Sequence, residues 1–463
     1  MFKKIEIWIL YLTILLGIIL AFGFGVLVRQ EIEGVTKQGS IDISFLSKPA
    51  ANIARLPERF VKTLFNPSII NNAFFGENRY FFNQVSFDGT PNSDESYLLL
   101  SRYDADLEEG VVELVDLTNF KVLHSWNPDI DSFNNLVEQV DEFEHLKRDT
   151  NNKRSFLVHP KLTMDGGLLF QDSSPLRKID SCSELVFQNT DDIFHHSIET
   201  DIDGNIWSPS HMYPQTLPTK KVGRGLGDFD FNYYDDAIVK LSSDGEVLYQ
   251  KSVSQIFLEN GLEYLLFAVV GNKFEVDPIH LNDIQPVLTD GPYWKRGDIF
   301  LSLRNQSMVI LYRPSTNKII WKGVGHIAGQ HDVDILDDYR ISIFNNNAMT
   351  FFDGDEVDGN NEVVIYDFKT DSYSKYFDES LKQNDVRTIT NGRSEILPNG
   401  NLFIEESIYG RILYFNKDGS LRWTYVNSSK KGKIGRLAWS RILYNLEEIQ
   451  TVNNFLNNRK CNG

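Results

Sequence analysis

The feature that most constrains the fold is a hairpin pattern that occurs six times along the chain. Each segment has thirteen residues, alternates apolar with polar side chains, turns near its centre and ends in an aromatic residue. The segments are Leu114–Trp126, Pro175–Phe187, Ala237–Tyr249, Val309–Trp321, Val364–Tyr376 and Arg411–Trp423. Alternation with a period of two is typical of β-strands, and polar turns between two such runs indicate hairpins. The chain is therefore expected to repeat one antiparallel unit.

Further strands are expected ahead of these hairpins. A short apolar strand precedes each one: Tyr97–Leu100, Gly167–Phe170, Asn205–Trp207, Asp298–Leu303, Arg340–Phe344 and Asn401–Ile404. Most of these follow yet another strand: Ser197–Thr200, Asp283–Leu288, Asp332–Leu336 and Ser394–Leu397. Four-stranded units that recur every ~45–70 residues are typical of a β-propeller. We predict an all-β, six-bladed propeller over residues 80–430, in which the first strand of each blade lines a central channel.

The C-terminal residues 431–463 are expected to form a tail outside the blades. Residues 431–457 have a partly helical pattern, with apolar side chains at Leu437, Ile442, Leu443 and Leu446. This tail is expected to pack across the bottom or the side of the propeller.

The N-terminus carries a long apolar segment. Lys3 and Lys4 precede 22 uncharged residues from Ile7 to Val28, which as a helix can cross a bilayer core of about 30 Å. The two lysines favour a cytoplasmic N-terminus with the rest of the chain translocated. We predict an uncleaved anchor over residues 1–29, and a cleaved signal peptide is the alternative. Residues 30–79 are expected to form a juxtamembrane linker with a short amphipathic helix over residues 51–65.

Charge and cysteine content narrow the possible partners. The formal net charge of -18 argues against a nucleic-acid surface, which normally has a basic face. Cys182 and Cys461 are the two cysteines of the chain. In a translocated protein they could form one disulfide, and two unrelated thiols are an equally good interpretation. Two cysteines cannot make a zinc site by themselves.

Histidines stand at the entrances of predicted inner strands. His195 and His196, His280 and His331 each precede or begin such a strand, and Arg304 ends the second strand of the fourth blade. A closed ring of blades brings such positions to one channel mouth. Arginine and histidine together suit an anionic group, and histidine can also act as a nucleophile. The alternative to a functional site is that these histidines have only a structural role.

A metal site formed by three histidines is a second chemical interpretation, because imidazole suits zinc, copper and iron. A nearby guanidinium would repel the cation, so we expect no metal. The sequence contains no Gly-x-x-x-x-Gly-Lys-Ser/Thr loop and no Gly-x-Ser-x-Gly motif, so a nucleotide phosphate cradle and a serine elbow are not indicated. No cofactor is expected.

Five segments, in this order, carry a resemblance to a known family. They are His195-His196 with Asp203-Gly204-Asn205, then His280-x-Asn282, then Ser302-Leu303-Arg304-Asn305-Gln306-Ser307, then Gln330-His331-Asp332, and Arg393-Ser394-Glu395-Ile396 with Pro398-Asn399-Gly400-Asn401. Over roughly residues 155–425 the chain resembles the arylsulfate sulfotransferase family of bacterial periplasmic six-bladed propellers. That family transfers a sulfuryl group from a phenolic sulfate ester to another phenol without a nucleotide donor.

The resemblance implies roles for individual residues. His331 would be the nucleophile that is transiently sulfated, while His196, His280 and Arg304 would hold the sulfuryl oxygens and stabilise charge in the transition state. One of the histidines would protonate the leaving phenolate. Five further residues would bind substrate: His195, Asn282, Asn305, Gln306 and Arg393. His196 is favoured over His195 because His196-Ser197-Ile198-Glu199 parallels His331-Asp332-Val333-Asp334.

The resemblance also implies partners and a location. The partners would be an aryl sulfate and a phenol, and the propeller would be periplasmic. Together with the anchor predicted from the N-terminal apolar segment, this makes the protein a single-pass protein of the bacterial inner membrane with its propeller on the periplasmic side. A homo-oligomer is left open. Two alternatives to this enzyme remain: a non-catalytic propeller that binds a sulfated or other anionic ligand or a partner protein, and a metal-dependent oxidoreductase propeller.

Overall fold

The structure is a computed structural model that divides into two compact units. It describes residues 7–32, 37–38, 41–42, 46–47, 49–51, 53–54, 74–76, 79, 86–140, 143, 146, 149–218, 222, 233–268, 274–351 and 354–458. The first unit comprises Met1–Ile70, Leu217–Tyr234 and Val270–Val276, and the second comprises Asn71–Thr216, Asp235–Val269 and Asp277–Gly463.

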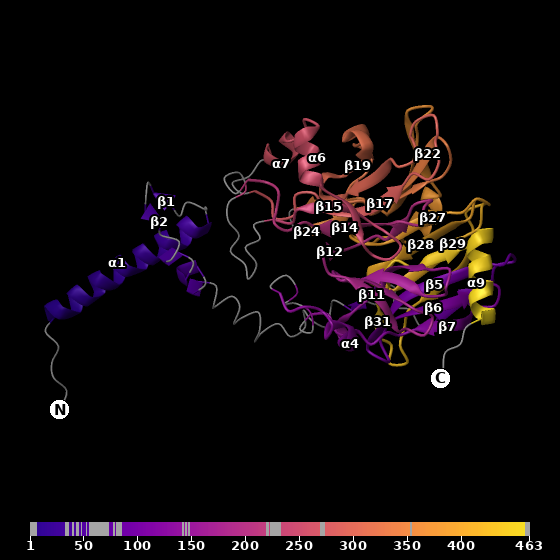
Figure 1. Ribbon diagram of the computed structural model, residues 1–463, viewed down its shortest axis with the longest axis horizontal. Helices are drawn as coiled ribbons and strands as arrows, with labels where there is room; N and C mark the ends of the chain where they lie inside the picture. Colours follow the sequence, from indigo (N-terminus) through magenta and orange to yellow (C-terminus); the bar gives the residue numbers. More distant parts are fainter. Residues whose placement is uncertain are drawn as a thin grey trace. The chain divides into compact units, whose positions relative to one another are not determined.

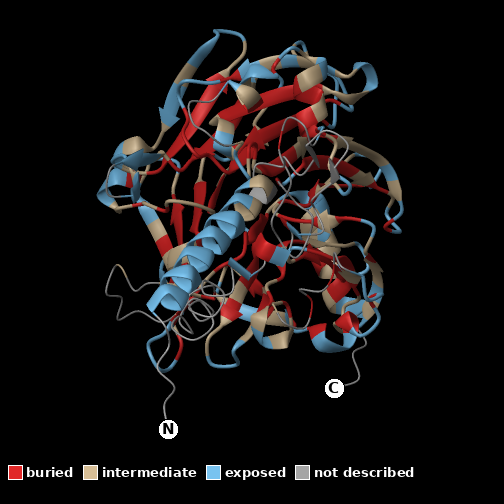
Figure 2. Cartoon of the chain, turned by 90° about the vertical axis from the view of Figure 1, so that its left-hand side faces the viewer, coloured by how far each residue is buried: buried red, intermediate tan, exposed pale blue. Residues whose placement is uncertain are grey.

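The first unit begins with helix α1, Ile7–Ile32. Its side chains from Ile7 to Val26 are exposed, and the helix is pale blue along most of its length in Figure 2. The stretch Ile7–Gln30 is long and apolar enough to span a membrane or to serve as a signal sequence. Strands β1, Lys37–Gln38, and β2, Ile41–Asp42, pair antiparallel after it. The amphipathic helix expected over residues 51–65 lies largely outside the described residues.

The second unit is a six-bladed β-propeller, as the hairpin pattern predicts (Figure 1). Each blade is an antiparallel sheet of four main strands. From the innermost strand outward, blades one to three are β32 Arg441–Leu443, β5 Tyr97–Asp104, β6 Glu109–Asp116 and β7 Lys121–Trp126; β8 Val158–Leu162, β9 Leu168–Gln171, β10 Leu176–Ile179 and β11 Leu185–Asn189; and β12 Ile193–Phe194 with β13 Glu199–Thr200, β14 Ile206–His211, β15 Asp236–Leu241 and β16 Val247–Ser252.

The other three blades follow the same order. They are β17 Leu281–Pro286, β18 Ile299–Leu303, β19 Met308–Arg313 and β20 Lys318–Gly323; β21 Asp332–Ile335, β22 Arg340–Asn345, β25 Glu362–Asp367 and β26 Ser372–Tyr376; and β27 Arg393–Ile396, β28 Leu402–Glu406, β29 Arg411–Phe415 and β30 Leu421–Val426 with β4 Ser86–Gly89 at the outer edge. A hairpin, β23 Ala348–Phe351 and β24 Gly354–Val357, is inserted in blade five, and β3 Phe75–Gly76 pairs with β31 Ile434–Gly435.

Both ends of the second unit close the ring. Strand β32, near the C-terminus, is the innermost strand of blade one, while β4, near the N-terminus, adds to the outer edge of blade six. The helical interpretation of the tail is therefore wrong for Ile442 and Leu443, which lie in β32. It holds for helix α9, Leu446–Asn458, which starts at the last of the four predicted apolar residues.

Short helices lie between or beside the blades. They are α4 Ile130–Asn134, α6 Val253–Glu259, α7 Tyr264–Phe267 and α8 Asp378–Gln383. The longer α9 places Val452 and Phe455 in the core between blades one and two, where Phe455 stacks on Trp126. Figure 1 shows α9 in yellow beside β5, β6 and β7.

The core lies between neighbouring blades. Strand β18 is buried along its whole length, whereas outer strand β20 alternates exposed with partly buried residues. Apolar side chains of blades four and five, among them Phe300, Leu311 and Ile343, form one such cluster. In Figure 2 the buried strands of the propeller appear in red inside a pale blue rim. Burial on both faces explains why these strands are almost continuously apolar.

Hydrogen bonds between neighbouring inner segments join all six blades around the axis. Five of the links are His159 N–H to Ala438 O, Ile198 N–H to His159 Nδ1, Ile284 N–H to Ser197 Oγ, Val333 N–H to Asp283 Oδ2, and Ser394 N–H to Asp332 Oδ2. The sixth joins blade six to blade one, because the Glu405 carboxylate accepts the N–H groups of Trp439 and Ser440. In every link except that between His159 and Ala438, a side chain thus accepts an inner backbone N–H group.

The Glu405 link can be tested by changing only its hydrogen-bonding capacity. Glu405→Gln replaces one accepting oxygen by an amide donor, which leaves a buried N–H unpaired and should cost about 1–3 kcal/mol. The thermal midpoint of the purified protein should fall, whereas Glu246→Gln, at an exposed position, should leave it unchanged. Equal midpoints for the two variants would show that the Glu405 link does not hold the ring closed.

Candidate active site at the channel mouth

The inter-blade hydrogen bonds define equivalent positions in neighbouring blades. Ser197, Asp283 and Asp332 each accept the backbone N–H of the next blade. The residues immediately before them are His196, Asn282 and His331, so the structure places the two histidines at equivalent positions. The ring centroids of His196 and His331 are 6.5 Å apart, and those of His196 and His280 are 5.0 Å apart. Segments separated by up to 135 positions in sequence (196 to 331) therefore meet at one mouth.

Two of these histidines have a strained backbone. His196 has a φ of 61° and His280 a φ of 54°, in the left-handed region that non-glycine residues seldom adopt. Such a conformation costs on the order of 1 kcal/mol and persists only where the surroundings enforce it. Strain of this kind is frequent at functional sites, so it supports a role for both residues.

His331 is fully buried and held in one tautomer. Its Nδ1 lies 2.7 Å from Asn346 Oδ1 and 3.1 Å from Gly329 O, two acceptors that require a proton on Nδ1. Its Nε2 accepts the backbone N–H of Asn391 at 3.0 Å and lies 3.2 Å from Thr390 Oγ1. Burial, reinforced by the nearby His280 and Arg304, lowers the pKa of His331 to about 3. The ring is therefore neutral, with a basic lone pair on Nε2.

His280 is oriented by a carboxylate that the sequence analysis missed. Its Nδ1 is hydrogen-bonded to Asp277 Oδ2, and its side chain is 25% exposed. Asn305 and Gln306, predicted substrate ligands, instead donate to the backbone carbonyls of Asp277 and Pro278. Because these two amides hold the segment that carries Asp277, they position the aspartate–histidine pair.

Arg304 presents part of its guanidinium without a partner. Its Nη1 donates to Asn305 Oδ1 at 2.8 Å, while its Nε is buried and has no hydrogen-bond partner among the described residues. Desolvation lowers the pKa of Arg304, and the carboxylate of Asp277 opposes this effect. A buried N–H without an acceptor is costly, so the arginine is suited to receive an anionic oxygen.

His195 and His196 form a pair through their Nδ1 atoms, which are 2.8 Å apart. Burial lowers the pKa of His195 to about 4 and holds that of His196 well below its usual value. Asn282 donates to Gln330 O, and its buried Oδ1 has no hydrogen-bond partner in the described part of the chain. The group around His331 thus contains mainly uncharged donors and acceptors.

Arg393, the remaining predicted ligand, lies inside the channel. It donates to Ser440 O and to Glu395, and it lies 3.8 Å from Asp332. Desolvation raises the pKa of Glu395 to about 7, and Arg393 opposes this effect. A second pair, Arg441 with Glu199 at 2.8 Å, lies nearby. Arg393 therefore makes its hydrogen bonds and ion pairs with residues of the channel wall.

A cavity of about 180 Å³ adjoins His195 and His196. His195, His196, Asn391, Trp439 and Phe156 are among the residues that line it. The ring of Trp439 lies 6.1 Å from that of His196 and 6.3 Å from that of His331. Trp439 comes from the segment that leads into β32, so its place at the mouth depends on the ring closure that the sequence did not reveal.

The described residues also contain one group that could hold a metal ion. It consists of His195, His211 and Asp236, and differs from the three-histidine set considered in the sequence. The residues around His331 itself combine imidazoles with a guanidinium and are better suited to an anion.

A six-bladed propeller with imidazoles and an arginine at one mouth defines a class of protein that can bind an anionic group near its axis. Residues 159–428 match the arylsulfotransferase (ASST) family, so the chain belongs to this family. The resemblance noted in the sequence is confirmed, and the family implies a sulfotransferase enzyme with aryl sulfate and phenol as substrates.

Other comparisons concern the fold. A crystal structure of a protein of unknown function from Bacteroides caccae is 11% identical, with a TM-score of 0.45 over 76% of this chain and 99% of that one. Virginiamycin B lyase from Staphylococcus aureus is 12% identical, with a TM-score of 0.31 over 57% of this chain and 68% of that one. A search of curated protein sequences found no match.

The protonation state of His331 can be measured directly. In protein labelled with ¹⁵N-histidine, the His331 signals should show a protonated Nδ1 and an unprotonated Nε2 that stay unchanged from pH 5 to 8, because the lowered pKa lies below this range. Loss of the signals in His331→Gln would assign them. A titration midpoint near 6.5 would contradict the neutral, buried imidazole.

Proposed function

We propose that this protein transfers a sulfuryl group from an aryl sulfate ester to a phenol, and that His331 carries the group between the two half-reactions. The observation that carries this proposal is a neutral imidazole with its lone pair on Nε2, near Arg304, whose buried Nε–H has no acceptor among the described residues. An unprotonated nitrogen is required for nucleophilic attack.

In the first half-reaction Nε2 of His331 attacks the sulfur, and the bond between sulfur and the phenolic oxygen breaks. The imidazole then carries a positive charge, which is shared with the Nδ1–H that donates to Asn346 Oδ1. The leaving phenolate takes the Nε2 proton of His280, which enters this step as an imidazolium with its Nδ1–H held by the Asp277 carboxylate. His280 is then left neutral. In the second half-reaction an acceptor phenol returns a proton to His280 and attacks the sulfur, and the bond between sulfur and His331 Nε2 breaks, which restores the neutral imidazole.

The charge at the mouth supports a sulfate ester over a phosphate ester. The lowered pKa values of His331, His195 and His196 leave Arg304 as the nearby permanent cation among the described residues of this group. The Asp277 carboxylate balances the charge of a protonated His280, so the one guanidinium balances the single charge of an aryl sulfate. A phosphate group carries about −1.5 to −2 at neutral pH, and its second charge would be desolvated without a partner.

Attack requires one local movement. The lone pair of Nε2 accepts the Asn391 N–H, and Asn391 also lines the cavity beside His196. Asn391 and Gly392 have φ angles of 56° and 89°, so the backbone here is already strained at a non-glycine residue. We expect the Thr390–Asn391 segment to withdraw when the ester enters, which exchanges one hydrogen bond on Nε2 for the bond to sulfur.

A kinetic experiment tests the proposal. The purified protein should release 4-nitrophenol from 4-nitrophenyl sulfate in the presence of phenol, with parallel lines in double-reciprocal plots. His331→Gln should reduce kcat at least about 1,000-fold, as expected when a nucleophile is removed. His326→Ala is the matched control, because His326 is exposed and stacks on Tyr373. Full activity of His331→Gln would rule out the proposed nucleophile.

A second variant tests the arginine. Arg304→Lys keeps the charge but removes the Nε–H and the planar fork, so kcat/KM should fall about 100-fold. Arg296→Lys, which alters an exposed arginine paired with Asp203, should leave kcat/KM unchanged. If no reaction occurs with any aryl sulfate while the esters bind, the alternative of a non-catalytic anion-binding propeller is favoured.

A further inference from the structure

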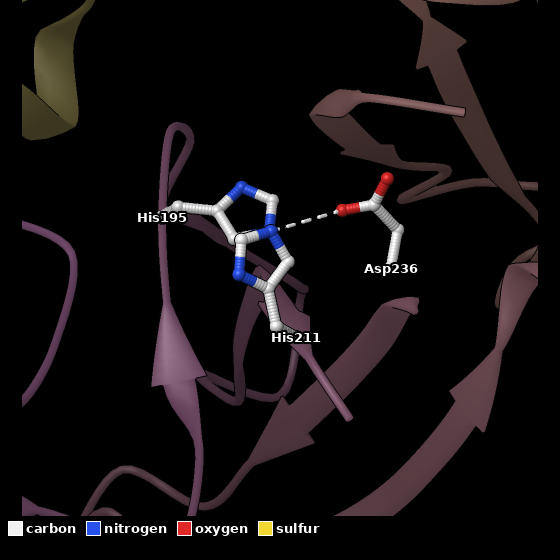
Figure 3. A group of neighbouring side chains, drawn as sticks. All are labelled: His195, His211 and Asp236. Atoms are coloured by element: carbon white, nitrogen blue, oxygen red, sulfur yellow. Dashed lines mark ion pairs between the residues drawn. The ribbon is translucent and has the colours of Figure 1, made fainter. Parts of the chain in front are cut away.

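Three potential ligand atoms converge beside the channel mouth. Asp236 Oδ1 lies 3.3 Å from His195 Nε2 and 3.4 Å from His211 Nε2. One ligand atom from each of the three residues lies within 4.8 Å of the others. Figure 3 shows both imidazoles on the same side of the Asp236 carboxylate. The residues come from neighbouring segments of one blade, since His211 ends β14 and Asp236 begins the paired strand β15.

The contacts inside this group leave buried polar atoms unsatisfied. His195 Nε2 and Asp236 Oδ1 have no hydrogen-bond partner among the described residues, because their 3.3 Å approach lacks hydrogen-bond geometry. Both residues are more than nine-tenths buried, with exposures of 7% for His195 and 1% for Asp236. Unsatisfied buried atoms are rare in folded proteins and indicate a missing partner.

The ion pairs of the buried Asp236 carboxylate are also limited. Among the described residues they are made with His195 and His211, at 3.3 and 3.4 Å. No lysine or arginine in the described parts of the chain forms an ion pair with it. Nδ1 of His195 is engaged by His196 at 2.8 Å, so Nε2 is the ring nitrogen that His195 offers to this group. A buried negative charge needs a cation.

We propose that His195, His211 and Asp236 bind one divalent transition metal ion, most suitably zinc, in a four-coordinate site with one open position. Two imidazole nitrogens and one carboxylate oxygen are a common ligand set for such ions. Ligands at 2.0–2.1 Å from a tetrahedral centre are about 3.3 Å apart, which is close to both distances from Asp236 Oδ1. The His211 side chain is 23% exposed and provides a route for entry.

The surroundings resemble the outer shell of known metal sites. The second oxygen of Asp236 accepts the backbone N–H of Leu281 at 3.0 Å, which fixes the carboxylate. With a metal on Nε2 of His195, the proton of that ring lies on Nδ1 and is donated to His196 Nδ1. The proton of His196 then lies on Nε2. A metal-bound histidine is usually fixed in this way by the partner of its second nitrogen.

This arrangement gives the metal a positioning role that rests on the proposed function. It would keep His196 as a donor on Nε2, able to contact a sulfuryl oxygen, without the metal touching the substrate. Metal binding itself does not depend on the transfer reaction, so an experiment can contradict one proposal and leave the other standing.

Metal analysis of the full-length protein, purified in detergent without chelators, tests the site. We expect about one zinc equivalent for the wild type and for His326→Ala, which removes an exposed histidine elsewhere. His211→Ala, at the least buried ligand, should lose the metal and bind added zinc at least about 100-fold more weakly. After chelation, added zinc should raise Tm in the wild type and not in His211→Ala.

Two further readouts keep the test decisive. The chelated wild type, loaded with cobalt(II), should show the strong visible absorption of a four-coordinate site, and His211→Gln provides a second variant if His211→Ala does not fold. Absence of stoichiometric metal in the wild type, retention of zinc by folded His211 variants, or the weak absorption of six-coordinate cobalt would each overturn the proposal.

Discussion

The structure depends on closure of the ring by a strand from near the C-terminus. β32 completes blade one from the inside, and the preceding Trp439 and Ser440 donate their N–H groups to Glu405 of blade six. Without this link the six blades would be an open arc, and the entrances of their inner strands would not face one another. His196, His280 and His331 belong to three consecutive blades, and closure adds Trp439 beside His196 and His331.

Burial sets the protonation state of these histidines and therefore the chemistry that they can perform. Imidazoles that are removed from water lose their affinity for protons, and here the lowered pKa values extend to His159, His195, His196 and His331. A neutral imidazole serves as a nucleophile or a metal ligand, whereas a protonated one serves as neither. The same desolvation thus supports the proposed sulfuryl carrier at His331, and the proposed metal ligand His195 lies on the other side of His196.

Much of the fold could be predicted from sequence, because alternating side chains and polar turns act over a few residues. The six hairpins agree with the structure for this reason, as does the place of the histidines before inner strands. Strand β32 could not be found in this way. It has three residues, Arg441–Leu443, and pairs with Tyr97–Leu99, more than 300 positions earlier. Its partner depends on the closed ring, which local patterns do not encode.

Only part of the site could be predicted, because local patterns do not reveal residues that come together from distant segments. The resemblance named Arg304 and His331 from contiguous motifs, but the partners that orient and complete the group came from elsewhere in the chain. Asp277 stands on an irregular segment with no strand pattern, and Asp236 lies 25 positions after His211. Asn305 and Gln306 were expected at the substrate, and the structure shows them bound to the backbone that carries Asp277.

The central claim is that the group in transit is bound to His331. Mass spectrometry of the wild-type protein, quenched while it turns over 4-nitrophenyl sulfate and then digested, measures this directly. The account predicts one added sulfuryl mass on the peptide that contains His331, and its disappearance when phenol is added before the quench. A sulfuryl group on the peptide of His196 or His280, or steady nitrophenol release with no adduct on any peptide, would contradict it.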